Sequence, residues 1–313
     1  MSLHNKKELA GVFPILATPF NDDGSVDFDS LRELIRFELK AGVDGLGLFG
    51  NASEAYTLLE SEKNEITEVI KDEIKGRIPL IYGSGHTSAE GAVKLSLKAQ
   101  QNGADALMIM PPSMVKPDGK RLYEYYAKIA NAVDVPIMIQ DAPNTSGVNI
   151  PAATIARLAR EFDNILYVKV EAPPTINKIT EVLEATQGDV RVFSGLNGMY
   201  MYEEFCRGAV GTMPACEFPD VTVGIYSEYM AGNHDKSREL FYKYLPMIRF
   251  GTIPNFAMSV HKEILKKGGV IRSAYVRNPN APLDDRMRKE VFDTLAGREL
   301  LALNWRTDLD LNN

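Results

Sequence analysis

The strongest constraint on the fold is a regular alternation of short apolar runs with amphipathic segments along the 313 residues. The apolar runs are rich in strand-forming residues, and they are Val12–Thr18, Gly45–Gly50, Pro79–Gly83, Ala106–Met110, Pro136–Gln140, Ile165–Val170, Arg191–Ser194 and Val210–Pro214. Segments with helical periodicity separate most of them, for example Ser30–Ala41, Ser61–Lys75, Ser88–Asn102 and Leu122–Ala132. A spacing of about 30 residues is typical of a βαβ unit. Eight strands, each followed by a crossover, predict an α/β fold of the (β/α)8 TIM-barrel type and not a doubly wound sheet.

The predicted helices carry start and stop signals. Ser61 and Ser88 can each accept a hydrogen bond at a helix N-terminus, and the pair Asp29-Ser30 precedes the first helix. Glycine ends helices readily because it adopts a left-handed conformation without strain. The first three predicted helices are each followed by one, at Gly42, Gly76 and Gly103.

After about residue 232 the pattern predicts helices only. These are Lys236–Met247, Asn255–Lys267 and a helix that begins at Asp284-Asp285 and runs toward Ala302, and a shorter one at Gly198–Arg207 separates the last two strands. We therefore expect a barrel over residues 1–232 and a C-terminal helical subdomain over residues 233–313. No low-complexity linker separates the two, so we expect them to pack directly on each other.

Composition excludes several classes of function. A net charge of −7 without a basic stripe disfavours nucleic-acid binding. Two cysteines, Cys206 and Cys216, form no disulfide framework and indicate a reducing compartment. The first seven residues lack the apolar region of a signal peptide, and no stretch is long and apolar enough to span a membrane. We expect a soluble, cytoplasmic protein with no metal, because no cluster of His, Cys, Asp and Glu has ligand spacing.

Lys169 is the first candidate for chemistry, because it ends an apolar strand and is followed by Glu171 two residues on. Desolvation of an amine lowers its pKa and exposes the nucleophilic free base that attacks a carbonyl to form a Schiff base. The alternative is a lysine whose stem is buried and whose head reaches water. Side chains alternate along a strand, so Lys169 and Glu171 share a face if the strand persists that far.

Polar and small residues gather where the predicted strands end, which is where barrel enzymes place their active sites. The segments concerned are Gly50–Glu54, Gly83–His86, Gln140–Pro143, Lys169–Glu171 and Ser194–Asn197. Glycine and alanine let a ligand approach backbone N–H groups closely, which suits a carboxylate or a phosphate. Such turns need small residues in any case, so the glycines alone are weak support for a site.

The chain resembles the dihydrodipicolinate synthase and N-acetylneuraminate lyase superfamily over nearly its whole length. The motifs that carry the resemblance are Gly11-Val12-Phe13-Pro14, Thr18-Pro19-Phe20, Asp44-Gly45-Leu46, Gly50-Asn51-Ala52-Ser53-Glu54, Gly103-Ala104-Asp105-Ala106, Pro136-Ile137-Met138, Ile165–Lys169, Ser194-Gly195 and Pro282-Leu283. The resemblance implies an imine between Lys169 and a 2-oxo acid, and a substrate carboxylate held at Asn51 and Ala52. It also implies a homotetramer and no cofactor.

The chain departs from the synthases of this superfamily in informative positions. Gln140 stands where they carry a proton-relaying tyrosine, and Thr145 stands where an arginine binds a second carboxylate. Pro112-Ser113 replaces paired aromatic residues, and Asn51-Ala52 replaces a pair of threonines. This combination resembles the dehydratase branch, which converts 2-keto-3-deoxy-L-arabonate to 2-oxoglutarate semialdehyde. Synthase activity in lysine biosynthesis is therefore not expected.

The chemistry of an imine agrees with dehydration. An imine at C2 acidifies the C3 protons, and the resulting enamine expels a C4 hydroxyl that an acid protonates. We expect Lys169 and Glu171 to be catalytic, with Glu171 as the proton shuttle; its alternative is a carboxylate at the barrel rim that pairs a nearby cation. Gln140 can hydrogen-bond a substrate hydroxyl but cannot act as an acid or base. The predicted substrate-binding residues are Asn51, Ala52, Gln140, Gly195, Thr212 and His86.

Three other functions stay open at this point. An aldolase that cleaves a 2-keto-3-deoxy acid to pyruvate and an aldehyde would use the same lysine. A barrel that binds 2-oxo acids without turnover would explain the missing tyrosine, although the retained lysine and glutamate argue against it. A phosphate-binding barrel would use Gly83-Ser84-Gly85 or Gly195–Gly198. His86 is more often structural when it stands alone, and Ser53, Glu54 and Asp141 are expected to brace turns.

Overall fold

The computed structural model of the protein describes residues 8–310. The strands are β1 (Gly11–Val12), β2 (Leu46–Leu48), β3 (Leu80–Gly83), β4 (Ala106–Ile109), β5 (Ile137–Asp141), β6 (Ile165–Val170), β7 (Arg191–Ser194) and β8 (Gly211–Thr212). The helices up to β8 are α1 (Phe28–Ala41), α2 (Glu60–Ile74), α3 (Ala89–Gln101), α4 (Gly119–Ala130), α5 (Pro143–Ser146), α6 (Ala152–Glu161), α7 (Thr175–Thr186) and α8 (Met201–Phe205). The helices after β8 are α9 (Pro219–Met230), α10 (His234–Ile248), α11 (Ala257–Lys267), α12 (Asp285–Leu295) and α13 (Leu301–Asp310).

The described chain forms two compact units. Unit 1 contains residues 8–11, 79–196 and 200–213, and unit 2 contains residues 12–78, 197–199 and 214–310. All eight strands belong to one sheet. The predicted boundary at residue 232 stays a prediction. The C-terminal helices belong to a unit that also includes α1 and α2.

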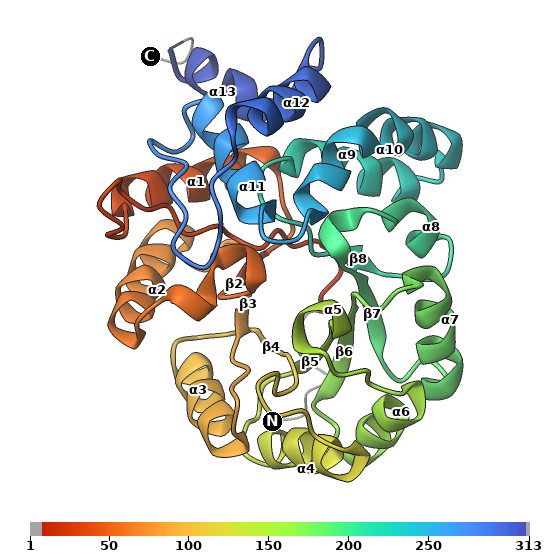
Figure 1. Cartoon of the computed structure of the whole chain (residues 1–313). Coiled ribbons are helices and arrows are strands. Elements are labelled where there is room, and N and C mark those ends of the chain that lie inside the picture. Colours follow the sequence, from red (N-terminus) through yellow and green to blue (C-terminus); the bar gives the residue numbers. More distant parts are fainter. Residues whose placement is uncertain (1–7, 311–313) are drawn as a thin grey trace. The chain divides into compact units, whose positions relative to one another are not determined.

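Unit 1 is built on parallel strands β3 to β8, each paired with its neighbour in chain order. Helices α3, α4, α6 and α7 lie outside these strands (Figure 1). Fully buried side chains of β4, β5 and β6 meet those of the helices; they include Leu107, Ile139, Val168, Ile155 and Leu158. Each such side chain stabilises the fold by about 1.5–3 kcal/mol relative to an exposed one. The apolar runs therefore form a core, as strands covered by crossover helices should.

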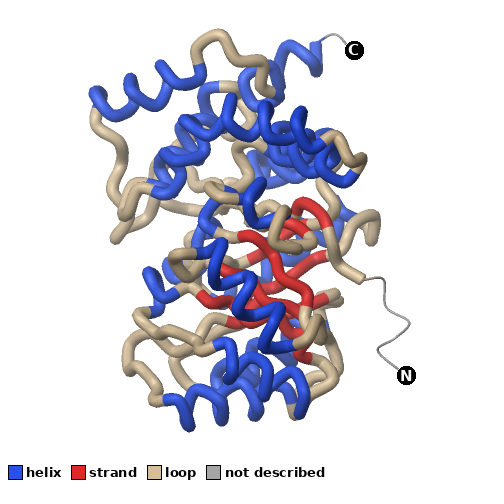
Figure 2. The backbone as a smooth tube through the Cα atoms, turned by 90° about the vertical axis from the view of Figure 1, so that its right-hand side faces the viewer, coloured by secondary structure: helices blue, strands red, loops and turns tan. Residues whose placement is uncertain are grey.

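Unit 2 contains β2, helices α1 and α2, and the C-terminal helices. Ile15 makes parallel bridges to Gly47, next to β2, and to Ala215. Beyond β8 the described chain contains helices and loops and no strand, as the smooth tube in Figure 2 shows. The prediction that the tail is helical is confirmed, with α9 as an additional helix that the pattern did not single out. The one helix expected from Asp284-Asp285 toward Ala302 is instead two, α12 and α13.

The ends of α1 and α3 show which capping residues the sequence predicts correctly. Ser88 caps α3 as predicted, because its hydroxyl accepts from Gly91 N at 3.1 Å. Gly42 follows α1 in the left-handed conformation, with φ of 79°. The cap of α1 is Asp27, whose Oδ1 accepts from Ser30 N at 3.0 Å, and not the predicted Asp29-Ser30 pair. Both aspartates precede the same apolar face, so spacing alone did not separate them.

Parallel strands that pair in chain order and alternate with helices confirm the predicted (β/α)8 barrel with C-terminal helices. The predicted runs overlap all eight strands, but the first run, Val12–Thr18, shares only Val12 with β1, and β1 and β8 are only two residues long. Among residues 8–310, no helix is both long and apolar enough to cross a membrane.

Candidate active site

Lys169 lies near the carboxyl end of β6, in the parallel sheet of unit 1. Its register partners are Gln140 on β5 and Phe193 on β7. Only 3% of Lys169 is exposed. The neighbouring strands thus surround this amine, so its stem is buried among them. This places a potential nucleophile where barrel enzymes carry out their chemistry.

Glu171 follows β6 and extends its ladder by one residue, since Glu171 N donates to Asp141 O at 2.9 Å. This extension keeps the side-chain alternation of the strand, so Glu171 and Lys169 point to the same face. Lys169 Nζ lies 3.5 Å from Glu171 Oε1. The strand alternation therefore persists to Glu171, and it brings the amine and the carboxylate together.

Gln140 holds the Glu171 carboxylate from the neighbouring strand. Its Nε2 donates to Glu171 Oε2 at 2.7 Å, and the backbone N of Leu196 approaches Oε1 at 3.4 Å. Gln140 is itself buried in β5, so its amide cannot swing away easily. The glutamine therefore orients the carboxylate, a contact that the sequence did not predict.

Gly195 makes room for the same carboxylate. A Cβ atom at this position would lie 2.2 Å from Glu171 Cγ and 2.7 Å from Val170 O. Neither distance is possible for real atoms, and the backbone oxygen cannot move without disturbing β6. Glycine is required here because the Glu171 side chain crosses directly over the backbone.

Thr212 lies one strand further along the sheet, paired in register with Ser194. Both residues are fully buried. Within the described part of the chain, Thr212 Oγ1 has no hydrogen-bond partner. A buried hydroxyl is rarely left unsatisfied in a native protein. The predicted contact of Thr212 with substrate stays a prediction.

His86 lies apart from this group, on an exposed loop between β3 and α3. Its Nδ1 accepts from Ser88 N at 3.0 Å, and its backbone N donates to the Tyr125 hydroxyl at 3.1 Å. A Cβ on Gly91 would lie 2.1 Å from that ring nitrogen. These contacts give His86 a role at the start of α3, and its predicted contact with substrate stays a prediction.

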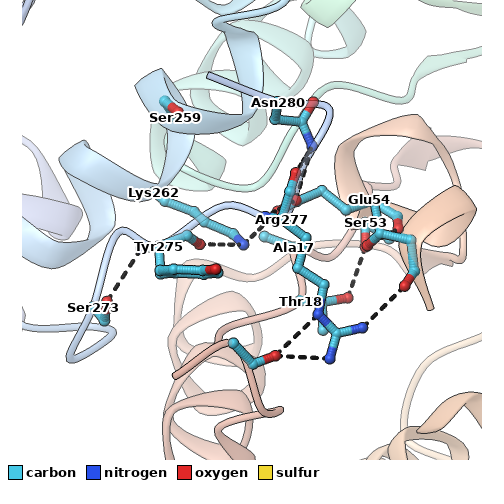
Figure 3. Close-up of polar contacts among 12 residues, drawn as sticks. Ala17, Thr18, Ser53, Glu54, Ser259, Lys262, Ser273, Tyr275, Arg277 and Asn280 are labelled. Carbon is cyan, nitrogen blue, oxygen red and sulfur yellow. Dashed lines mark hydrogen bonds and ion pairs between the residues drawn. The ribbon is translucent and has the colours of Figure 1, made fainter. Parts of the chain in front are cut away.

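The predicted carboxylate-binding turn lies in unit 2. Residues Asn51–Ser53 form a 3-10 helix that ends at Glu54, and Asn51 and Ala52 are partly exposed. The turn is fastened to the segment after β1: Ser53 Oγ donates to Leu16 O at 2.6 Å, and Thr18 Oγ1 donates to Ser53 O at 2.8 Å. Figure 3 shows Thr18, Ser53 and Glu54 together. Bracing by Ser53 matches the expectation from sequence.

Two buried carboxyl groups of unit 1 were not singled out as candidates from the sequence. Asp141, fully buried, has its Oδ2 3.4 Å from Lys178 Nζ, and burial raises its pKa despite that lysine. Burial raises the pKa of Glu204 on α8 to about 7, against the lowering effect of the Ser194 and Thr175 hydroxyls. A five-residue helix has too little periodicity to reveal which of its glutamates is buried.

The described residues include no group of three or more His, Cys, Asp or Glu side chains that could hold a metal ion. The candidate site in unit 1 is therefore an amine, a carboxylate and an amide: Lys169, Glu171 and Gln140. Such a set can form an imine, move a proton and hold a hydroxyl group.

A buried lysine and a carboxylate thus lie at the carboxyl ends of parallel strands in a (β/α)8 barrel. A profile of the Dihydrodipicolinate synthetase family matches residues 8–297. The chain belongs to this family, and it shares the lyase function of the superfamily.

The sequence is similar to relatives of two different activities. The L-2-keto-3-deoxyarabonate dehydratase of Azospirillum brasilense is 32% identical over 302 residues, which cover 94% of this chain and 96% of the relative. The 4-hydroxy-tetrahydrodipicolinate synthase of Chlorobium limicola is 34% identical over 292 residues, which cover 92% and 97%. Overall identity thus does not separate a dehydratase from a synthase.

Solved structures agree with the family. The dihydrodipicolinate synthase of Thermotoga maritima superposes with a TM-score of 0.86 at 30% identity, over 91% of this chain and 97% of that one. A prophage protein of the dihydrodipicolinic acid synthase family from E. coli K12, solved in complex with pyruvate, gives a TM-score of 0.85 at 25% identity, over 91% and 97%.

Proposed function

We propose that this chain is a hydro-lyase that removes water from a 2-keto-3-deoxy sugar acid through an imine on Lys169, with 2-keto-3-deoxy-L-arabonate as substrate and 2-oxoglutarate semialdehyde as product. The observation that carries the proposal is the geometry of Lys169, Glu171 and Gln140. The amine lies 3.5 Å from a carboxylate that an amide, and no tyrosine, holds in place.

The reaction begins when Lys169 Nζ attacks the C2 carbonyl and water leaves, giving a protonated imine. Glu171 removes a C3 proton, and the electron pair moves into the imine to form an enamine. The enamine then expels the C4 hydroxyl as water, with Glu171 returning the proton to it. Loss of the hydroxyl leaves a C3–C4 double bond conjugated to the imine. Loss of a C5 proton and protonation at C3 turn this species into a C4–C5 enol, and protonation at C4 converts the enol to the aldehyde. Hydrolysis of the imine then releases 2-oxoglutarate semialdehyde and regenerates the lysine.

Gln140 favours elimination over carbon–carbon cleavage. An aldolase needs a group that takes the proton from the C4 hydroxyl while the C3–C4 bond breaks. An amide cannot take a proton at neutral pH, whereas it can donate to Glu171 and hydrogen-bond a substrate hydroxyl. The Azospirillum brasilense relative is an L-2-keto-3-deoxyarabonate dehydratase, which supports the same reaction.

The remaining predicted contacts complete the proposal. Asn51 and Ala52 would hold the substrate carboxylate, as the resemblance implies, and the Thr212 hydroxyl would take a hydrogen bond from or give one to the substrate. His86 would act at the rim. Gly195 leaves space for Glu171, and its contact with substrate stays part of the proposal. We further expect a cytoplasmic homotetramer without cofactor.

Borohydride trapping tests the proposal. The protein is incubated with 2-keto-3-deoxy-L-arabonate or with pyruvate, reduced, and examined by intact mass and peptide mapping, and products are identified without borohydride. The expected result is an adduct on Lys169 and semialdehyde as product. Lys178→Met, which removes another lysine of unit 1, is expected to keep the adduct, and Lys169→Met is expected to lose it. Pyruvate and an aldehyde as products would select the aldolase, and no adduct would remove the imine.

A further inference from the structure

A second buried lysine–glutamate pair lies in unit 2, directly beside the turn that contains Asn51 and Ala52. Glu54 is fully buried, and Lys262 on α11 is 1% exposed. Lys262 Nζ donates to Glu54 Oε1 and, at 2.9 Å, to Tyr275 O (Figure 3). An ion pair removed from water in this way needs nearly complete hydrogen bonding to be tolerated.

The other oxygen of Glu54 is equally well satisfied. Its Oε2 accepts from Arg277 N at 3.0 Å and from Asn280 Nδ2 at 2.9 Å. The ammonium of Lys262 also lies 4.1 Å from the centre of the Phe20 ring. All of the named donors to Glu54 come from the chain after residue 260, so one carboxylate ties the turn to the C-terminal part of unit 2.

The backbone of Glu54 ends the turn in an unusual conformation. Its φ is 53°, in the left-handed region that side-chain-bearing residues rarely adopt. In this conformation Glu54 N donates to Asn51 O at 2.9 Å and closes the 3-10 turn. A backbone held in a sparsely populated region persists only where surrounding contacts fix it. The Glu54 side chain supplies such contacts.

We propose that Lys262 is a positioning residue which, by holding the Glu54 carboxylate, fixes the turn Gly50–Glu54 in the conformation that receives the carboxylate of the 2-oxo acid. The inference rests on the proposed function, because it takes the turn to be the carboxylate site. Lys262 touches no reacting atom. Its loss should weaken substrate binding while the chemistry on Lys169, once substrate is bound, proceeds as before.

The test measures the pyruvate concentration that gives half-maximal borohydride trapping on Lys169, together with KM and kcat for 2-keto-3-deoxy-L-arabonate. Glu54→Gln and Lys262→Met are expected to raise the half-maximal concentration and KM about tenfold and to change kcat less than about threefold. Asn280→Ala removes one donor at a partly exposed position, and it should raise both about threefold without loss of folding.

Asp27→Asn is the matched control. It weakens another buried carboxylate of unit 2, paired with Arg272, and leaves the turn alone. Half-maximal concentrations that match the wild type in Asn280→Ala and in folded Glu54→Gln would overturn the inference, as would an equal rise in Asp27→Asn. If Glu54→Gln does not fold, Asn280→Ala decides. Absence of any adduct in the wild type would instead remove the proposed function, and the inference with it.

Discussion

Two buried lysine–glutamate pairs of this protein are held very differently. Around Lys169 and Glu171 the charged atoms are 3.5 Å apart, and 13% of the glutamate side chain is exposed. Around Lys262 and Glu54 neither side chain is more than 1% exposed, and both carboxylate oxygens accept hydrogen bonds from donors of the C-terminal segment. In the proposed function the Lys169–Glu171 pair is left for a bound molecule to contact. In the Lys262–Glu54 pair the protein itself supplies the hydrogen bonds to both carboxylate oxygens.

This difference separates a reactive pair from a structural one. A lysine that must attack a carbonyl needs an amine that can leave its partner, whereas an anchoring lysine needs contacts on every side. In the sequence Lys169 is flanked by valines and followed by its partner Glu171, whereas Lys262 lies between His261 and Glu263 and its partner Glu54 is 208 positions away. The geometry assigns them to different work.

The largest expected effect follows from breaking the Lys262–Glu54 pair. Lys262→Met leaves the Glu54 carboxylate buried without its cation and should lower the free energy of unfolding by about 3 kcal/mol. Glu54→Gln combined with Lys262→Met removes both charges and should recover most of that loss. Urea denaturation at pH 7 measures both variants. Equal stability of the single and double variants would contradict a buried ion pair.

A substitution in the Lys169–Glu171 pair should change turnover and not stability. Glu171→Gln keeps the shape of the side chain but removes the proton shuttle, so kcat should fall about 100-fold. Borohydride should still trap substrate on Lys169, because the amine is intact. Full turnover in this variant would mean that Glu171 only pairs a cation, and loss of trapping would mean that it acts earlier, in imine formation.

Displacing the Lys169–Glu171 pair should have a smaller effect than removing it. Gly195→Ala places a Cβ where Glu171 Cγ now lies, so the carboxylate must move away from Lys169, and kcat should fall about tenfold. Gly224→Ala is the control, because that helical glycine has open space around its Cβ position. Steady-state kinetics of the two variants should differ; similar kinetics would show that Glu171 has room to adjust.

The smallest effect concerns Glu204, a buried carboxyl of unit 1 that lacks a lysine partner among its named contacts. Its pKa rises from 4.5 to about 7 on folding, so the folded state holds an extra proton between those values. Its contribution to stability is therefore present below pH 4.5 and lost as pH rises through 7. Glu204→Gln does not titrate, so its stability relative to the wild type should be greater at pH 8 than at pH 5.

Thermal or urea unfolding of Glu204→Gln at pH 5 and pH 8 checks this sign. The stability difference between variant and wild type should grow with pH. A difference that is the same at both values would show that the carboxyl does not titrate in this range.

The parts of the molecule that follow local rules could be predicted from the sequence. Apolar runs and helix signals gave the order of strands and helices, and side-chain alternation placed Glu171 beside Lys169. The Ser88 cap depends on three neighbouring residues and was predicted, whereas the start of α1 was placed two residues late because two aspartates compete for it.

Contacts between distant segments could not be predicted. Glu54 and Lys262 are 208 positions apart, and no local pattern around either residue indicates that it contacts the other. Gln140 and Glu171 come from neighbouring strands, but the bond between them depends on strand register, which a single sequence does not fix. Gly195 appeared as a glycine of a turn, and its closeness to Glu171 depends on where that side chain crosses the backbone.

The contact between Glu54 and the C-terminal segment also has a consequence for synthesis on the ribosome. Chains emerge from the N-terminus, so the Asn51–Ser53 turn leaves the exit tunnel long before residues 262–280 are made. During that interval Glu54 must keep its carboxylate in water, and its left-handed backbone has no anchor. The turn therefore acquires its final form only when nearly the whole chain has been translated, well after Lys169 has left the tunnel.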